Sequence, residues 1–266
     1  MILKQLLERL EYEVVQGSDK IEITTLINDS RKVEEGSVFV CISGAVSDGH
    51  QYVADVAKKG AKAVIVQQDV EAPAGMTVIR VEDTRYALAL ASAAYFGYPA
   101  EKLHIIGITG TKGKTTTTYM IKSILEGVGH KVGLIGTIEA IIGEEVIPAA
   151  NTTPESYTIH QYFAKMVEAG CDSVVMEVSS QGLMLHRTAG IPLKSGFSQI
   201  LEKIISDRMN TRILKIIKDA KAYCSSSAGL ELPMQMTGIL RMYLKMLHVK
   251  WRHLVSAKRR ICGLKM

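Results

Sequence analysis

The chain has 266 residues, 47% of them hydrophobic, which is enough for about two domains with buried cores. No apolar run reaches the roughly 18 residues that a membrane span needs, and residues 1–10 alternate charge with leucine, which predicts an amphipathic helix and not a signal peptide. We therefore expect a cytoplasmic protein. Its four scattered cysteines are expected to be free, buried thiols: Cys41, Cys171, Cys224 and Cys262.

The net charge of +5 is unevenly distributed along the chain. Residues 194–266 contain 15 Lys and Arg against 4 Asp and Glu, whereas residues 1–193 contain 17 against 23. A break of this kind usually marks a basic tail that binds nucleic acid or a membrane surface.

Residues 1–98 predict a small α/β domain. Strands are expected at short apolar runs, and helices where apolar residues recur with a helical period or follow a capping residue. The expected strands cover residues 21–23, 37–42, 63–66 and 77–81, and the expected helices cover residues 1–10, 52–59 and 84–96. The sequence Gly97-Tyr98-Pro99 breaks the chain, so we place a domain boundary after residue 98.

Residues 99–192 predict a second α/β domain. The expected strands cover residues 104–109, 131–136 and 173–178, and the expected helices cover residues 114–126 and 155–169. Strands that are apolar on both faces and alternate with helices indicate a doubly wound parallel sheet. Ligands bind such sheets at the carboxyl ends of the strands, where a glycine-rich loop, Glu177 and Ser179 are expected to lie.

The glycine-rich loop has the chemistry of a phosphate-binding loop. It runs through Gly110, Thr111, Lys112, Gly113, Lys114, Thr115 and Thr116. Glycines let backbone N–H groups converge on a polyphosphate, and the following helix adds its positive end. Lys114 is expected to reach the β- and γ-phosphates, and the Thr115 hydroxyl to ligate Mg²⁺. The general pattern GxxxxGK[ST] places glycine at position 108, where this chain has Ile108.

The loop with this departure, together with four further motifs, resembles the Mur ligase family of ATP-dependent amino-acid ligases. The loop resembles the family's TGTxGKTT. The other matching segments are Asp29-Ser30-Arg31 with residues 36–40, Gly44 with residues 48–50, Asn151-Thr152-Thr153-Pro154-Glu155, and residues 176–183 (MEVSSQGL) with His186-Arg187. They cover residues 1 to about 192, and the last two are similar to those of the members that add the third residue of the peptidoglycan stem peptide.

The resemblance implies a reaction and its partners. ATP phosphorylates the terminal carboxylate of UDP-MurNAc-L-Ala-D-Glu, and the amine of a diamino acid, meso-diaminopimelate or lysine, attacks the acyl phosphate. The fold implied is a UDP-MurNAc-binding domain (1–98) followed by an incomplete ATP-binding domain (99–192). A cytoplasmic monomer that serves peptidoglycan biosynthesis, without nucleic acid or membrane partners, is expected.

The resemblance also assigns roles to single residues. Lys114 is the catalytic candidate, and Thr115 and Glu177 are the Mg²⁺ candidates. The muramyl-peptide candidates are Ser30, Asn151, Thr152, Thr153, Ser179 and Arg187. Plainer alternatives stay open: a surface carboxylate for Glu177, helix caps for Thr152, Thr153 and Ser179, and a turn residue for Ser30. Leu185 replaces a residue that is often polar in the family, which leaves a contact there in doubt.

The match ends near Pro192, and residues 193–266 are interpreted as an out-of-frame tail with no native domain. Restoring one base after Pro192 allows codons that read the family's FTN and DH segments, and out-of-frame acidic codons explain the basic composition. The alternative is a genuine basic helical appendage. The frame hypothesis predicts a fragment with little or no ligase activity and an aggregation-prone sheet edge.

Two competing functions remain. One is a related ligase, the D-Ala-D-Ala-adding enzyme or a folylpolyglutamate synthetase, although the Asp29-Ser30-Arg31 and Asp48-Gly49-His50 loops disfavour the folate enzyme. The other is a non-catalytic nucleotide or nucleic-acid binder that uses the basic tail.

Overall fold

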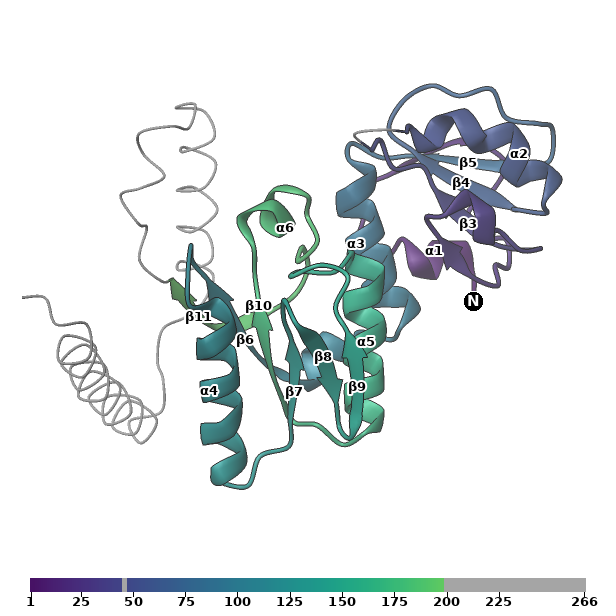
Figure 1. Ribbon diagram of the computed structural model, residues 1–266. Coiled ribbons are helices and arrows are strands. Elements are labelled where there is room, and N and C mark those ends of the chain that lie inside the picture. The colour runs from purple at the N-terminus through teal and green to yellow at the C-terminus, as the bar shows by residue number, and fades with distance from the viewer. Residues whose placement is uncertain (45–46, 199–266) are drawn as a thin grey trace, which may run out of the picture. The chain divides into compact units, whose positions relative to one another are not determined.

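The computed structural model describes residues 1–44 and 47–198, which form two sheets with their helices (Figure 1). Within these residues, no helix combines the length and the apolar character needed to cross a membrane. The frame hypothesis and its basic-appendage alternative concern residues 199–266 almost entirely, so both lie outside the described residues.

The first sheet has five strands in the order β1-β5-β4-β3-β2, and only β1 runs antiparallel to its neighbour. Its strands are β1 (Glu13–Gln16), β2 (Leu26–Ile27), β3 (Val38–Val40), β4 (Ala63–Val66) and β5 (Thr77–Arg80). Its helices are α1 (Leu3–Leu6), α2 (Val53–Lys58) and α3 (Thr84–Tyr95), with 3₁₀ turns η1 (Ser30–Lys32) and η2 (Gly49–Tyr52).

Alternation along the buried strands separates two cores in this first unit. Val38 and Val40 pack with residues of α1 and α3, whereas Phe39 and Cys41 pack with residues of α2. Successive side chains of a strand point to opposite faces, so a strand that is apolar throughout requires a helical layer on each side. Asp83 starts α3 by accepting the backbone N–H groups of Arg85 and Tyr86, as a capping residue does.

The second sheet has six strands in the order β11-β6-β10-β7-β8-β9. The strands are β6 (His104–Thr109), β7 (Val132–Ile135), β8 (Glu139–Ile142), β9 (Glu145–Pro148), β10 (Ser173–Glu177) and β11 (Leu193–Ser198). The first four in sheet order are parallel, and β8 and β9 add an antiparallel hairpin. The expected α/β class with a parallel, phosphate-loop sheet is therefore confirmed.

Helices α4 (Lys114–Gly127), α5 (Ser156–Glu168) and α6 (Ser180–Met184) follow strands of the second sheet, and the 3₁₀ turn η3 (Pro99–Lys102) precedes it. Helix α4 packs on β6, β10 and β7, while α5 packs on β8 and on α3, a helix of the first sheet. The core beneath α5 includes Ile159, Phe163 and Met166, which recur at helical spacing on the buried face of α5. Because β6, β10 and β7 are parallel neighbours, their carboxyl ends lie at one edge of the second sheet.

Three sequence predictions differ from the structure. Residues 21–23 form no strand, because Ile23 packs into the core and the only ladder contact is a bridge between Ile2 and Glu22. The first helix spans only Leu3–Leu6, and Leu7 lies in the turn that follows. Strands β1, β2, β8 and β9 were not predicted, since each is short or partly exposed. Strand β11 was not predicted because residues 193–266 were interpreted as a tail.

The predicted boundary after residue 98 falls between α3 and β6 and stays a prediction. The second sheet continues past Pro192, where the sequence resemblance was expected to end, because β11 pairs in parallel with β6.

Candidate nucleotide and substrate site

The phosphate loop joins the end of β6 to the start of α4. Gly113 occupies the left-handed region at φ 78°, directly before the first residue of the helix, and Gly110 has φ 150°. These are backbone conformations that residues with a Cβ rarely adopt. The Lys114 Nζ donates to the Gly110 carbonyl at 2.9 Å, so the lysine folds back over its own loop. The backbone thus forms a turn opening at a helix N-terminus, the arrangement that binds phosphate.

Position 108 explains the departure from the general phosphate-loop pattern. Ile108 is fully buried inside β6 and pairs in register with Glu177 on β10 and Phe197 on β11. A glycine there would remove core packing from a central strand. The loop therefore begins two residues later, at Gly110.

Glu177 ends β10 and is fully buried, so the alternative of a surface carboxylate is wrong. Its Oε1 accepts the backbone N–H of Thr137 at 2.9 Å, and its Oε2 accepts the Thr137 hydroxyl at 3.0 Å. Burying a carboxylate is costly unless its charge is offset, and a hard cation is a ligand that would offset it.

The hydroxyls of the NTTP and EVSS segments meet beside Glu177. Thr153 Oγ1 donates to the Glu177 carbonyl at 3.0 Å and accepts the Ser179 N–H at 2.9 Å, while Thr152 Oγ1 lies 3.1 Å from Thr137 Oγ1. Ser179 caps α6 by accepting the Gly182 N–H at 3.0 Å, so its capping alternative is confirmed. Neither threonine caps α5, whose N-cap is Glu155 and makes no side-chain capping bond. Asn151 is exposed.

Arg187 lies against the same segment. Its guanidinium donates to the Thr153 carbonyl at 2.8 Å and pairs with Glu155 at 2.5 Å, and only 13% of its side chain is exposed. The buried Nε has no hydrogen-bond partner among the described residues. The predicted substrate residues Thr152, Thr153, Ser179 and Arg187 are therefore brought together.

Ser30 lies apart from these hydroxyls, at the start of the turn η1. It lines a cavity of about 670 Å³ with Asn28, Arg31 and Tyr52. Arg31 donates to Asp29 through its side chain and its backbone N–H, and these bonds lower the pKa of Asp29 to about 2. This carboxylate is thus ionised near neutral pH and fixes the turn that presents Ser30.

A second cavity, of about 420 Å³, is lined by residues from both segments. Asn28 and Asp29 contribute from the turn before η1, and Glu155, Tyr157 and Gln161 contribute from α5 and its N-cap. Asp29 lines both cavities, and Glu155 is the ion partner of Arg187.

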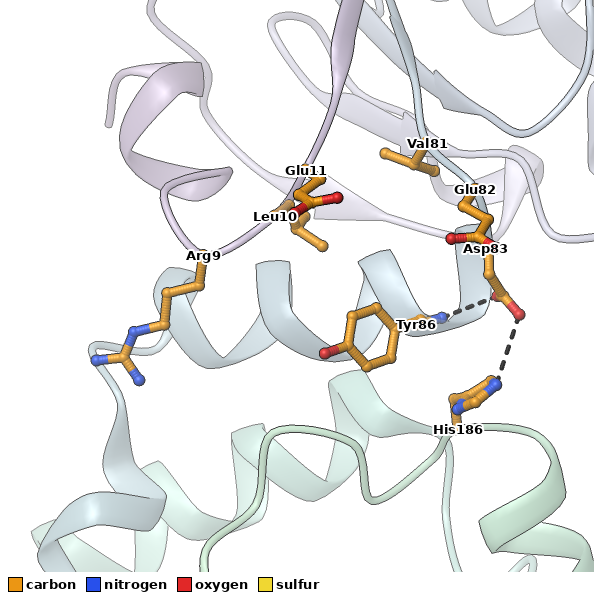
Figure 2. Close-up of a pocket in the computed structure, with 8 residues that line it drawn as sticks. All are labelled: Arg9, Leu10, Glu11, Val81, Glu82, Asp83, Tyr86 and His186. Atoms are coloured by element: carbon orange, nitrogen blue, oxygen red, sulfur yellow. Dashed lines mark hydrogen bonds and ion pairs between the residues drawn. The ribbon is translucent and has the colours of Figure 1, made fainter.

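A third cavity, of about 680 Å³, is shown in Figure 2. Tyr86 of α3 and Asp83, the N-cap of α3, face His186. Asp83 Oδ2 lies 3.6 Å from His186 Nε2, and the rings of Tyr86 and His186 are in an edge contact at 5.7 Å. His186 is a non-glycine residue at φ 54°, a strained conformation that this contact supports. The remaining lining residues are Arg9, Leu10, Glu11, Val81 and Glu82.

Other residues have structural partners. His50 accepts the Gln67 N–H at Nε2 (3.1 Å), so its ring proton sits on Nδ1 and is donated to Asp48 (2.5 Å). This agrees with the structural role expected for His50. Cys41 and Cys171 are free and buried, as predicted, and burial raises the pKa of the Cys41 thiol to about 12. Cys224 and Cys262 lie outside the described residues.

Sequence reasoning missed Thr137 and the pair formed by Tyr119 and Glu139. The Tyr119 hydroxyl donates to Glu139 at 2.7 Å, and burial, that bond and the charges of Glu139 and Glu177 raise the pKa of Tyr119 to about 12. One signal was available for Thr137: it directly follows the predicted strand 131–136, at the edge where Glu177 was expected.

Two family profiles match this chain. The profile described as "Mur ligase family, catalytic domain" matches residues 22–96, and the one described as "Mur ligase middle domain" matches residues 108–201.

Curated relatives are similar over the same region. The UDP-N-acetylmuramoyl-L-alanyl-D-glutamate–2,6-diaminopimelate ligase of Clostridium perfringens is 52% identical over 196 residues, which cover 74% of this chain and 40% of the relative. The ligase of the same name from Clostridium tetani is 45% identical over 199 residues, 74% of this chain and 41% of the relative. The chain thus spans about two fifths of the length of these relatives.

Solved structures support the fold alone. A structure titled as UDP-N-acetylmuramoyl-L-alanyl-D-glutamate–2,6-diaminopimelate ligase aligns with a TM-score of 0.67 at 21% identity, over 84% of this chain and 44% of that one. The MurF of Acinetobacter baumannii aligns with a TM-score of 0.53 at 20% identity, over 87% of this chain and 46% of that one.

Proposed function

Because this chain belongs to the Mur ligase family, we propose that it provides the ATP site and the UDP-MurNAc-L-Ala-D-Glu site of a ligase that adds the third residue of the peptidoglycan stem peptide. The observation that carries the proposal is the convergence of the phosphate loop, the buried Glu177 and the hydroxyls of Thr152, Thr153 and Ser179 at one sheet edge. The names of the relatives favour 2,6-diaminopimelate over lysine as the third residue.

Each residue has a proposed task. Backbone N–H groups from Gly110 to Thr116 bind the phosphates of ATP, and Lys114 exchanges its bond with the Gly110 carbonyl for the β- and γ-phosphates. Thr115 and Glu177 would hold Mg²⁺, which fits their hard oxygen atoms and supplies positive charge against the phosphates.

The substrate residues act by binding and orientation. Ser30 binds the UDP-sugar end, and Arg187 with Asn151, Thr152, Thr153 and Ser179 orients the peptide end near the γ-phosphate. Orientation favours transfer of the γ-phosphoryl group to the terminal carboxylate, since a positioned pair reacts faster than free reactants. Attack by a diamino acid on the acyl phosphate then forms the amide and releases phosphate.

Calorimetric titration of the full chain tests this proposal. We expect micromolar to millimolar binding of MgATP and, separately, of UDP-MurNAc-L-Ala-D-Glu. Lys114→Ala should weaken MgATP binding at least about tenfold, because it removes a charged phosphate contact, and should leave the muramyl substrate unaffected. Wild-type chain that binds neither ligand, or Lys114→Ala chain that binds MgATP normally, contradicts the proposal.

A further inference from the structure

Thr137 bonds both oxygens of the Glu177 carboxylate. Thr137 gives its backbone N–H to Oε1 and its hydroxyl to Oε2, at 2.9 and 3.0 Å. The last torsion of a glutamate side chain is soft, so a carboxylate with one partner rotates readily. Two bonds from one residue of the hairpin corner after β7 fix that rotation, and full burial makes loss of either bond costly.

The space around the carboxylate is equally restricted. A Cβ built on Gly136 would lie 2.8 Å from Glu177 Oε1, closer than any real contact. The backbone of Gly136 and Thr137 therefore packs directly on the carboxylate. The side chain of Glu177 has no room to turn toward β7.

Hydrogen-bond polarity extends this arrangement to the substrate segment. The Thr137 hydroxyl donates to Glu177 Oε2 at 3.0 Å and is also within donating distance of Thr152 Oγ1, at 3.1 Å. It has one proton to give, so the two acceptors share it. One hydroxyl thus connects Glu177 to Thr152.

We propose that Thr137 is a positioning residue, which sets the orientation in which Glu177 meets Mg²⁺ and links it to Thr152 of the substrate segment. The inference rests on the proposed function, because it assigns Glu177 to the metal. Neither the motifs nor the phosphate loop includes Thr137, whose role follows only from its contacts with Glu177 and Thr152.

The test compares nucleotide binding with and without Mg²⁺ in the full chain. MgATP, and ATP in excess chelator, are titrated into wild type, Thr137→Val and Thr137→Ser. Thr137→Val keeps the shape and the backbone N–H but loses the hydroxyl, and it should weaken MgATP binding about tenfold without changing the metal-free affinity. Thr137→Ser restores the hydroxyl and should stay within about twofold of wild type.

Two further variants separate positioning from general damage. Thr152→Val removes only the outer hydroxyl and should weaken MgATP binding about two- to threefold, a readout that remains if Thr137→Val fails to fold. Thr24→Val is the matched control: it removes an exposed hydroxyl that donates to the Glu35 carbonyl at 3.0 Å, and it should bind as wild type.

The outcomes are distinguishable. Thr137→Val with wild-type MgATP affinity, or with equal losses with and without Mg²⁺, overturns the inference while the proposed function stands. If Thr137→Val does not fold, Thr152→Val with wild-type MgATP affinity overturns it in the same way. In the Glu177→Gln background, Thr137→Val should not weaken MgATP binding further, because Thr137 acts through Glu177. If the two losses of MgATP affinity add, Thr137 does not act through Glu177. A wild-type chain without MgATP binding removes the proposed function and the inference together.

Discussion

At the scale of single residues, Gly136 is expected to be sensitive to one added methyl group. Gly136→Ala places a Cβ 2.8 Å from Glu177 Oε1, so the carboxylate must move although every hydrogen-bonding group remains. We expect MgATP affinity to fall about tenfold. Gly127→Ala is the matched control, because a Cβ there meets nothing within 4 Å and no change in affinity is expected. Equal affinity of the two variants would show that the carboxylate tolerates displacement.

Arg187 is expected to affect substrate binding and stability together. Lysine keeps the charge but not the planar fork that reaches the Thr153 carbonyl and Glu155. Arg187→Lys should weaken binding of UDP-MurNAc-L-Ala-D-Glu about tenfold and lower the free energy of unfolding by about 1–3 kcal/mol. Denaturant unfolding and calorimetry measure both quantities. Arg9→Lys, at an exposed salt bridge with Glu101, should change the stability by less than about 1 kcal/mol.

Single residues also show what could be predicted from the sequence. Lys114, Glu177 and Ser179 were placed at strand ends by the order of strands and helices alone, and the structure puts them at one edge. Thr137 was missed because its contact with Glu177 joins residues 40 positions apart. Such a pairing depends on β7 and β10 being neighbours, which a local pattern does not specify.

At the scale of elements, helix α5 carries a buried acid-sensitive residue. His160 is fully buried, its ring meets Phe163 edge-on at 5.9 Å, and neither ring nitrogen has a partner among the described residues. Burial lowers the pKa of His160 from 6.5 to about 4. The unfolded chain therefore takes up a proton below about pH 6.5 while the folded chain does not, so stability falls with pH from about 6.5 to about 4 and this contribution is constant below.

We expect His160→Leu to flatten this acid dependence. The difference between the two pKa values corresponds to roughly 3 kcal/mol at most, all of it above about pH 4. At pH 7 the leucine variant should be at least as stable as wild type, because it buries no unpaired nitrogen. Urea unfolding between pH 4 and pH 7 measures the slope, and the exposed His104→Gln should retain it. An unchanged slope in His160→Leu would contradict the assignment.

Elements differed in how well their sequences predicted them. Strands β4, β6 and β10 are apolar on both faces, which identifies a buried strand without further information. Strands β1 and β9 are mostly exposed at sheet edges, so their sequences lack the apolar signal of a buried strand. Their extended conformation depends on pairing with the neighbouring strand.

At the scale of the whole molecule, the chain spans about two fifths of its curated relatives, and the reading-frame hypothesis makes a direct prediction. Sequencing the coding DNA around codon 193 should show that one base change after Pro192 opens a longer frame. Protein expressed from the restored frame should ligate 2,6-diaminopimelate to UDP-MurNAc-L-Ala-D-Glu with ATP. The 266-residue chain should show little or no turnover in the same assay. Turnover by that chain, or the absence of any longer frame, would refute the hypothesis.

The strand β11 has a consequence for how a sheet tolerates foreign sequence. Its residues 193–198 pair with β6 through main-chain groups, which every non-proline residue supplies. A sheet edge therefore selects for extended backbone more than for particular side chains. β11 covers the edge of β6, so the strand that carries the phosphate loop stays interior. A change of side chains in β11 that leaves its backbone extended should therefore leave the phosphate loop in place.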